Sequence, residues 1–248
     1  MAVSLIGLAF AASAQTLVTD IPLAGGGEKM LFAGAANPRA IAFVFAGGDG
    51  TVTFNAAGQP VHMAGNFLLR TQALWQAQGF AYVTLASSSS LMGRRHTPAY
   101  AELIGHAIDV ARSRANIPVW LIGTSMGSIA AANGAAHLPG RVQGVVLTSS
   151  VAGQNRDGET VFDSDLGAIA VPALIVSNRG DTCPSAGAGF APQILAGLAR
   201  APRKEIIYVE SHQLQSDPCE AMSPHGYLGI EADLVQRISD WIRAAGGR

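Results

Sequence analysis

The chain has 248 residues, of which 49% are hydrophobic and 13% charged, with a formal net charge of −1. A chain of this length and apolar content can bury a large core, and no Pro/Ser-rich linker divides it, so a single globular domain is expected. With no run of basic residues and almost no net charge, the sequence argues against nucleic acid as a main partner.

The N-terminus is apolar over residues 3–13 and ends in Ala12-Ser13-Ala14, which fits a secretory cleavage site after Ala14. We therefore predict a signal peptide at residues 1–14 and a mature domain at residues 15–248. The apolar run is too short to span a membrane. Because no Lys or Arg precedes Lys29, two alternatives stay open: the true start lies upstream, or the run is an ordinary N-terminal strand.

Further along the chain, strand and helix patterns alternate. Buried-strand patterns cover residues 40–45, 80–85, 119–122, 143–148, 171–178 and 204–210. Helical patterns cover residues 67–78, 98–115, a small-residue segment from Ser128 onward, 190–200 and 229–245. This alternation predicts an α/β fold with a mostly parallel central sheet and helices on both faces. Active residues are then expected at the carboxyl ends of the strands.

One turn between strand and helix has a distinctive sequence, Gly-Thr-Ser-Met-Gly at residues 123–127. In a Gly-x-Ser-x-Gly turn the central residue is held in a strained conformation, and the glycines remove side chains that would clash where strand and helix approach. The hydroxyl of Ser125 is then exposed at the start of a helix, whose dipole favours negative charge. We predict that Ser125 is a catalytic nucleophile.

This segment resembles the nucleophile elbow of the α/β-hydrolase superfamily, in which an acid and then a histidine follow the serine along the chain. Asp181 lies in the polar turn after the strand at residues 171–178, and His225 precedes the terminal helix. The resemblance implies a catalytic triad of Ser125, Asp181 and His225. It also implies an α/β-hydrolase fold, and residues 151–170 are too few for a large cap.

Other side chains compete for these roles. His212 directly follows the strand at residues 204–210 and is the rival base, although His225-Gly226 suits the family pattern better. Three carboxylates offer an alternative acid, but their surroundings suggest a surface loop: Asp157, Asp163 and Asp165. Asp217 and Glu220 are expected to be solvated surface charges.

The reaction also needs N–H groups that stabilise an oxyanion. In the family that this chain resembles, one donor is the residue after the nucleophile, here Met126. The other comes from the loop after the third strand, at residues 46–50, where Gly48 is our first choice and Asp49 the second. At the first position of this loop the chain has Ala46, whereas the superfamily that it resembles more commonly has His there. We expect the Asp49 carboxylate to turn away and brace the loop, because a negative charge facing the oxyanion would oppose it.

The two cysteines, Cys183 and Cys219, lie two residues after the candidate acid and six before the candidate base. An even cysteine count in an exported chain favours a disulfide, which would tie the two loops together. The alternative is two free buried thiols.

No cofactor or metal is expected, since four histidines lack a cysteine or carboxylate at metal-ligand spacing: His62, His96, His106 and His137. Arg94 and Arg95 lie in a loop on the expected active-site side. We expect them to be ordinary solvated side chains, and the less favoured alternative is that they bind an anionic group of the substrate. The sequence thus predicts a serine hydrolase of a small-molecule ester, or less favourably an amide. The alternative is a non-catalytic protein of the same fold that binds a ligand or partner.

Overall fold

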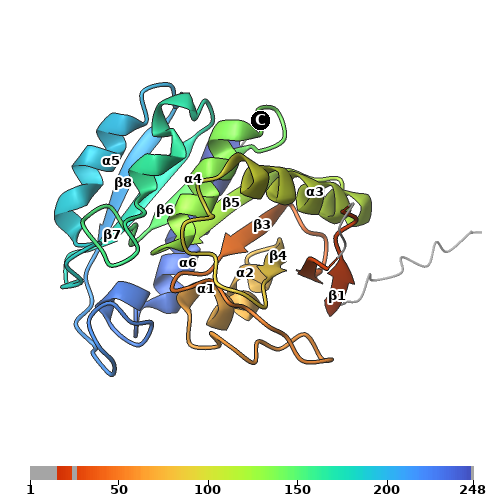
Figure 1. The fold of residues 1–248 in the computed structure, drawn as a ribbon, viewed down its shortest axis with the longest axis horizontal. Coiled ribbons are helices and arrows are strands. Elements are labelled where there is room, and N and C mark those ends of the chain that lie inside the picture. The colour runs from red at the N-terminus through yellow and green to blue at the C-terminus, as the bar shows by residue number, and fades with distance from the viewer. Residues whose placement is uncertain (1–15, 24–26, 247–248) are drawn as a thin grey trace, which may run out of the picture.

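The computed structural model describes residues 16–23 and 27–246, so the predicted signal peptide lies outside the described residues. The fold is built on an eight-stranded sheet with the order β1-β2-β4-β3-β5-β6-β7-β8 (Figure 1). The strands are β1 (Thr16–Asp20), β2 (Lys29–Ala33), β3 (Ala40–Phe45), β4 (Phe80–Ala86), β5 (Val119–Thr124), β6 (Gly144–Thr148), β7 (Ala173–Asn178) and β8 (Lys204–Val209).

From β4 to β8 every neighbouring pair of strands is parallel, whereas β1 and β2 pair in antiparallel fashion at one edge. The prediction of a mostly parallel sheet is therefore confirmed. The two edge strands were not predicted. β1 has only two apolar residues, Leu17 and Val18, between polar ones, and none of its five residues is fully buried.

Helices cover both faces of the sheet (Figure 1). They are α1 (Phe67–Arg70), α2 (Gln72–Ala77), α3 (Pro98–Arg114), α4 (Gly127–His137), α5 (Ala191–Gly197) and α6 (Glu231–Gly246), with 3-10 turns η1 (Val161–Ser164), η2 (Leu166–Ala168), η3 (Ala188–Phe190) and η4 (Pro224–Gly226). Successive side chains of a strand point to opposite faces. In β3, Phe43 accordingly packs in the core beneath α3, α4 and α5, while Val44 packs in the core beneath α1, α2 and α6.

Several predicted boundaries differ from the structure. The helix expected at residues 67–78 is interrupted at Thr71, whose Oγ1 donates a hydrogen bond to the carbonyl of Phe67 at 2.7 Å. The last helix begins at Glu231 because Gly229 has a φ of +85° and ends the preceding turn. Residues 151–170 form only loops and the short turns η1 and η2, so among the described residues this segment adds no large helical cap to the carboxyl edge of the sheet.

Candidate active site

Ser125 lies in the sharp turn between β5 and α4, with a φ of +55° that is unusual for a residue with a side chain. The glycines on either side permit this turn. A Cβ on Gly123 would lie 2.4 Å from the carbonyl oxygen of Gly127, and one on Gly127 would lie 2.1 Å from that of Phe45. The N–H of Ser125 donates to the carbonyl of Thr148 in β6 at 2.9 Å. These close backbone contacts fix the serine at the carboxyl edge of the sheet.

The predicted acid and base contact each other. Nδ1 of His225 lies 2.8 Å from Oδ2 of Asp181, and both side chains are buried. The other carboxylate oxygen, Oδ1, accepts a hydrogen bond from the N–H of Cys183 at 2.9 Å. With both oxygens engaged, the carboxylate has a single orientation, and it fixes the plane of the imidazole.

The backbone around His225 is held from several directions. The N–H of His225 donates to Oγ of Ser223 at 3.1 Å, and its carbonyl accepts from Oγ of Ser149 at 2.8 Å. Asn178, the last residue of β7, donates from Nδ2 to the carbonyl of Pro224 at 2.7 Å. The turn η4 is therefore attached to the ends of β6 and β7, which places the histidine beside the serine turn.

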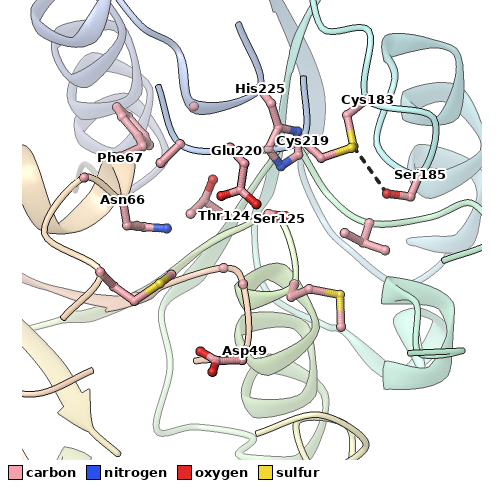
Figure 2. Close-up of a pocket in the computed structure, with 18 of the residues that line it drawn as sticks. Asp49, Asn66, Phe67, Thr124, Ser125, Cys183, Ser185, Cys219, Glu220 and His225 are labelled. Atoms are coloured by element: carbon pink, nitrogen blue, oxygen red, sulfur yellow. Dashed lines mark hydrogen bonds between the residues drawn. A yellow bond between two sulfur atoms is a disulfide. The ribbon is translucent and has the colours of Figure 1, made fainter. Parts of the chain in front are cut away.

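Ser125 and His225 line the same cavity, which has a volume of about 520 Å³. Figure 2 shows the imidazole directed toward this space, with Ser125 beneath it. Nε2 of His225 is buried and has no hydrogen-bond partner among the described residues. A buried ring nitrogen without a partner, in a cavity that a serine hydroxyl also lines, is available to exchange a proton with that hydroxyl or with a bound molecule.

The loop after β3 forms another part of the cavity wall and comes very close to the serine. A Cβ on Gly47 would lie 2.8 Å from Cβ of Ser125, so only glycine fits at that position. Gly48 follows with a φ of +57°. Within the described part of the chain, the N–H groups of Gly48, Asp49 and Met126 donate no hydrogen bond, and all three residues line the cavity. The predicted oxyanion donors thus lie beside the serine, with the choice between Gly48 and Asp49 still open.

The Asp49 carboxylate is turned away from the serine (Figure 2). Its two oxygens accept hydrogen bonds from the N–H and Oγ1 of Thr51 at 2.9 Å and 3.0 Å. The bond from the Thr51 N–H lowers the pKa of Asp49 despite the opposing effect of burial. The carboxylate therefore braces the loop in its ionised form, as predicted.

Arg95 departs from its predicted place in a solvated loop. Its side chain is buried, and Nη2 donates to the carbonyl of Gly48 at 2.8 Å, while Arg94 is exposed. Burial lowers the pKa of Arg95, and the carboxylates of Asp49 and Glu159 oppose that shift. This arginine contacts neither solvent nor the cavity. It supports the glycine loop from behind.

Cys183 and Cys219 form a disulfide with a Cα–Cα distance of 4.7 Å, so the predicted bridge is present and the alternative of two free thiols is wrong. Both cysteines line the cavity. The bridge joins the loop that carries Asp181 to the loop that carries His225.

The rival residues lie elsewhere. His212 is exposed and pairs with Glu210 at 3.1 Å, outside the cavity. Asp163 caps η1 by accepting hydrogen bonds from the backbone and side chain of Thr160, and Asp165 is exposed. Neither contacts His225. Asp157 lines the cavity, but the carboxylate that contacts the histidine is that of Asp181.

The remaining histidines have separate partners: His62 contacts the carbonyl of Thr51, His96 contacts Glu159 and His137 contacts the carbonyl of Asn133, while His106 is exposed. Within residues 16–23 and 27–246, no three His, Cys, Asp or Glu side chains are grouped as metal ligands. In the same ranges, no helix combines the length and the apolar character needed to cross a membrane.

Two functional features were missed by sequence reasoning. Glu220 is exposed, as expected of a surface charge, but it also lines the cavity (Figure 2). Arg70 was not considered, yet its guanidinium donates to the carbonyls of Gly65 and Gly226, both at 2.6 Å, and pairs with Glu231 at 2.8 Å. Since Arg70 and Gly226 are 156 residues apart in the chain, no local pattern could have indicated this contact.

Comparison with known proteins supports the fold assignment. No protein-family description and no curated protein matches the sequence. Among solved structures, dienelactone hydrolase from Anabaena variabilis is similar with a TM-score of 0.66 and 16% identity, over 93% of this chain and 98% of that one. The carboxylesterase EstE1 from a metagenomic library has a TM-score of 0.63 and 15% identity over 96% and 91% of the two chains. A lidless α/β serine hydrolase from Xanthomonas campestris has a TM-score of 0.59 and 13% identity over 94% and 96%. The chain therefore has the α/β-hydrolase fold, and the predicted fold is confirmed.

Proposed function

We propose that this chain, which has the α/β-hydrolase fold, is a serine hydrolase that cleaves carboxylic esters through an acyl-enzyme. The observation that carries the proposal is the buried hydrogen bond between His225 and Asp181. The other ring nitrogen of His225, Nε2, has no hydrogen-bond partner among the described residues and lies in the same cavity as the strained Ser125. The similarity to structures described as a carboxylesterase, a dienelactone hydrolase and a serine hydrolase supports the same reaction class.

In this mechanism Oγ of Ser125 attacks the ester carbonyl carbon while Nε2 of His225 accepts the hydroxyl proton. The carbonyl oxygen becomes an oxyanion, which the N–H groups of Met126 and Gly48 stabilise. The Asp181 carboxylate accepts a hydrogen bond from Nδ1–H and stabilises the imidazolium. The C–O bond to the alcohol then breaks, and His225 returns the proton to the leaving alcohol.

Deacylation repeats these steps with water. Nε2 of His225 accepts a proton from a water molecule, which attacks the acyl carbon, and the carboxylic acid leaves as the proton returns to Oγ of Ser125. Amides share this chemistry but have a poorer leaving group, so esters are the preferred class.

Covalent labelling tests the assignment directly. A fluorophosphonate probe should label the wild-type protein at Ser125, and Ser125→Ala should lose both labelling and hydrolysis of p-nitrophenyl esters while keeping its thermal midpoint. Removal of a triad serine lowers kcat by about a million-fold in a well-studied protease. A protein that binds a ligand without catalysis would show no labelling and no turnover, and that result would sink the proposal.

We further infer that residues 15–248 form one domain that works in an oxidising compartment, such as the periplasm or the cell exterior. The Cys183–Cys219 disulfide supports this, because structural disulfides persist mainly in such compartments. Thiol titration of the denatured, unreduced protein tests the bridge, and two titratable thiols would argue against an exported enzyme.

A further inference from the structure

The charged side chains of the catalytic cavity are unevenly distributed. Three carboxylates line it, those of Asp49, Asp157 and Glu220, while no Lys or Arg lines it among the described residues. Asp49 is committed to Thr51 and turned away from the serine. The carboxylates of Asp157 and Glu220 therefore set the charge that a bound molecule meets.

Glu220 is presented to the cavity by a firmly held loop. Its neighbour Cys219 is bonded to Cys183, its N–H donates to the carbonyl of Asp217 at 2.8 Å, and its carbonyl accepts from Oγ of Ser223 at 2.7 Å. Figure 2 shows its carboxylate pointing into the space that Ser125 and His225 face. Glu220 is exposed at the rim of the cavity, and no ion pair or side-chain hydrogen bond engages its carboxylate within the described ranges, so it is available to a substrate.

Asp157 adds a second negative charge from another loop. Its side chain is 18% exposed, and its nearest basic group, Nε of Arg156, lies 3.8 Å away on a side chain that is 91% exposed. A solvated arginine at that distance compensates the aspartate weakly.

The other cations near the cavity are already paired. Arg95 lies behind the glycine loop, bonded to the Gly48 carbonyl and within electrostatic reach of the carboxylates of Glu159, Asp49 and, most weakly, Asp157. Arg70 lies behind the wall and pairs with Glu231. His62 also lines the cavity; it is exposed, and its Nδ1 contacts the carbonyl of Thr51. Neither arginine presents a positive charge to a bound acid.

We propose, as an extension of the proposed ester hydrolysis, that the cavity selects esters that carry a cationic group and disfavours esters that carry a carboxylate, with Glu220 as the main specificity-determining residue. The buried Nε2 of His225, which has no hydrogen-bond partner among the described residues, independently indicates a place for a ligand in this cavity. An ammonium group in the cavity gains the attraction of two carboxylates, whereas a carboxylate is repelled by both.

Two matched ester series test this selectivity near neutral pH. The first varies the acyl group: the methyl ester of ε-aminocaproic acid, neutral methyl heptanoate and anionic monomethyl adipate. The second varies the alcohol: acetylcholine and its neutral isostere dimethylbutyl acetate. In at least one series we expect kcat/KM of the cationic ester to exceed that of the neutral one by about fivefold, the scale of a partly solvated ion pair. Salt near 1 M should reduce this ratio, because the screening length falls to about 3 Å.

Glu220→Gln should lower the ratio most of the way toward one, and Asp217→Asn, which should leave it unchanged, is the matched control, because Asp217 lies in the same loop but does not line the cavity. Equal kcat/KM for charged and neutral esters in both series would overturn the inference. A ratio that Glu220→Gln leaves unchanged would overturn the role of Glu220. If none of the five esters showed Ser125-dependent turnover, the proposed hydrolase function itself would fail, and the inference with it.

Discussion

At the scale of single residues, the choice of base depends on burial and contact. His225 and His212 both follow β8, and both have a carboxylate partner. They differ in place: His225 is buried against Asp181 in the cavity, while the His212 side chain is 74% exposed. Only the first can exchange a proton with Ser125.

We therefore expect His225→Ala to lower kcat by several orders of magnitude, as loss of a triad histidine does when the triad acts as a unit. His212→Ala is its control and should retain most activity, since it removes one exposed side chain. Steady-state kinetics on a p-nitrophenyl ester, with circular dichroism to check folding, measure both. If the two outcomes were exchanged, His212 would be the base.

The serine turn depends on glycine at positions 123 and 127, where a side chain would clash with backbone atoms. We expect Gly127→Ala to lower the free energy of unfolding by about 1–3 kcal/mol or more, because its Cβ would lie 2.1 Å from the Phe45 carbonyl oxygen. Gly189→Ala is the control, because no atom lies within 4 Å of its Cβ position. Urea denaturation of both variants measures the difference, and equal stability would contradict the contact.

At the scale of elements, the loop after β3 is held by a buried cation. Arg95 belongs to the segment between β4 and α3, and its backbone carbonyl accepts a hydrogen bond from Asn133 of α4 at 2.8 Å. Gly50 leaves room for the guanidinium, since a Cβ there would lie 2.6 Å from Nη2. The candidate oxyanion loop is thus positioned by two elements that are distant from it in sequence.

Arg95→Met should therefore lower kcat by about 10- to 100-fold with a smaller effect on KM, because a displacement of about 1 Å misplaces a donor needed mainly in the transition state. Arg94→Met changes the exposed neighbour and should have little effect. The comparison requires kcat and KM for both variants. A loss of kcat in Arg94→Met as large as in Arg95→Met would point to general damage to the loop.

At the scale of the whole molecule, the disulfide joins two catalytic loops that lie above a core formed elsewhere. The parallel strands β3, β5, β6 and β7 are buried along their whole length and form a core beneath these loops. The bridge closes 36 residues of chain, which corresponds to about 4 kcal/mol in the chain-entropy description.

On treatment with a reductant, we expect esterase activity to fall before the sheet unfolds. The reason is that the Asp181–His225 pair tolerates little displacement, whereas the core is remote from the bridge. Activity, free thiols and thermal midpoint should be followed together over a reductant series. Loss of activity only at the concentration that unfolds the protein would show that the bridge acts on global stability alone.

The sequence by itself determined the features that rest on local patterns. The alternation of strands and helices predicted a mostly parallel sheet, and the spacing of Gly123, Ser125 and Gly127 predicted the strained turn. Both follow from sterics and side-chain periodicity within a few residues, and distant parts of the chain do not alter them. The resemblance to the α/β-hydrolase superfamily added the prediction that Asp181 and His225 act together, and these residues, 44 positions apart in the chain, share a hydrogen bond.

Only the tertiary structure decided where the charged side chains lie. Arg95 and Glu220 both follow ordinary polar segments, yet one is buried 47 residues from its carbonyl partner and the other lines the cavity. The antiparallel edge formed by β1 and β2 was also settled only by the fold. The physical reason is common to all three. Whether a charged side chain can be buried, or a strand can add to a sheet, depends on the group that forms hydrogen bonds or an ion pair with it. That group comes from a remote part of the chain.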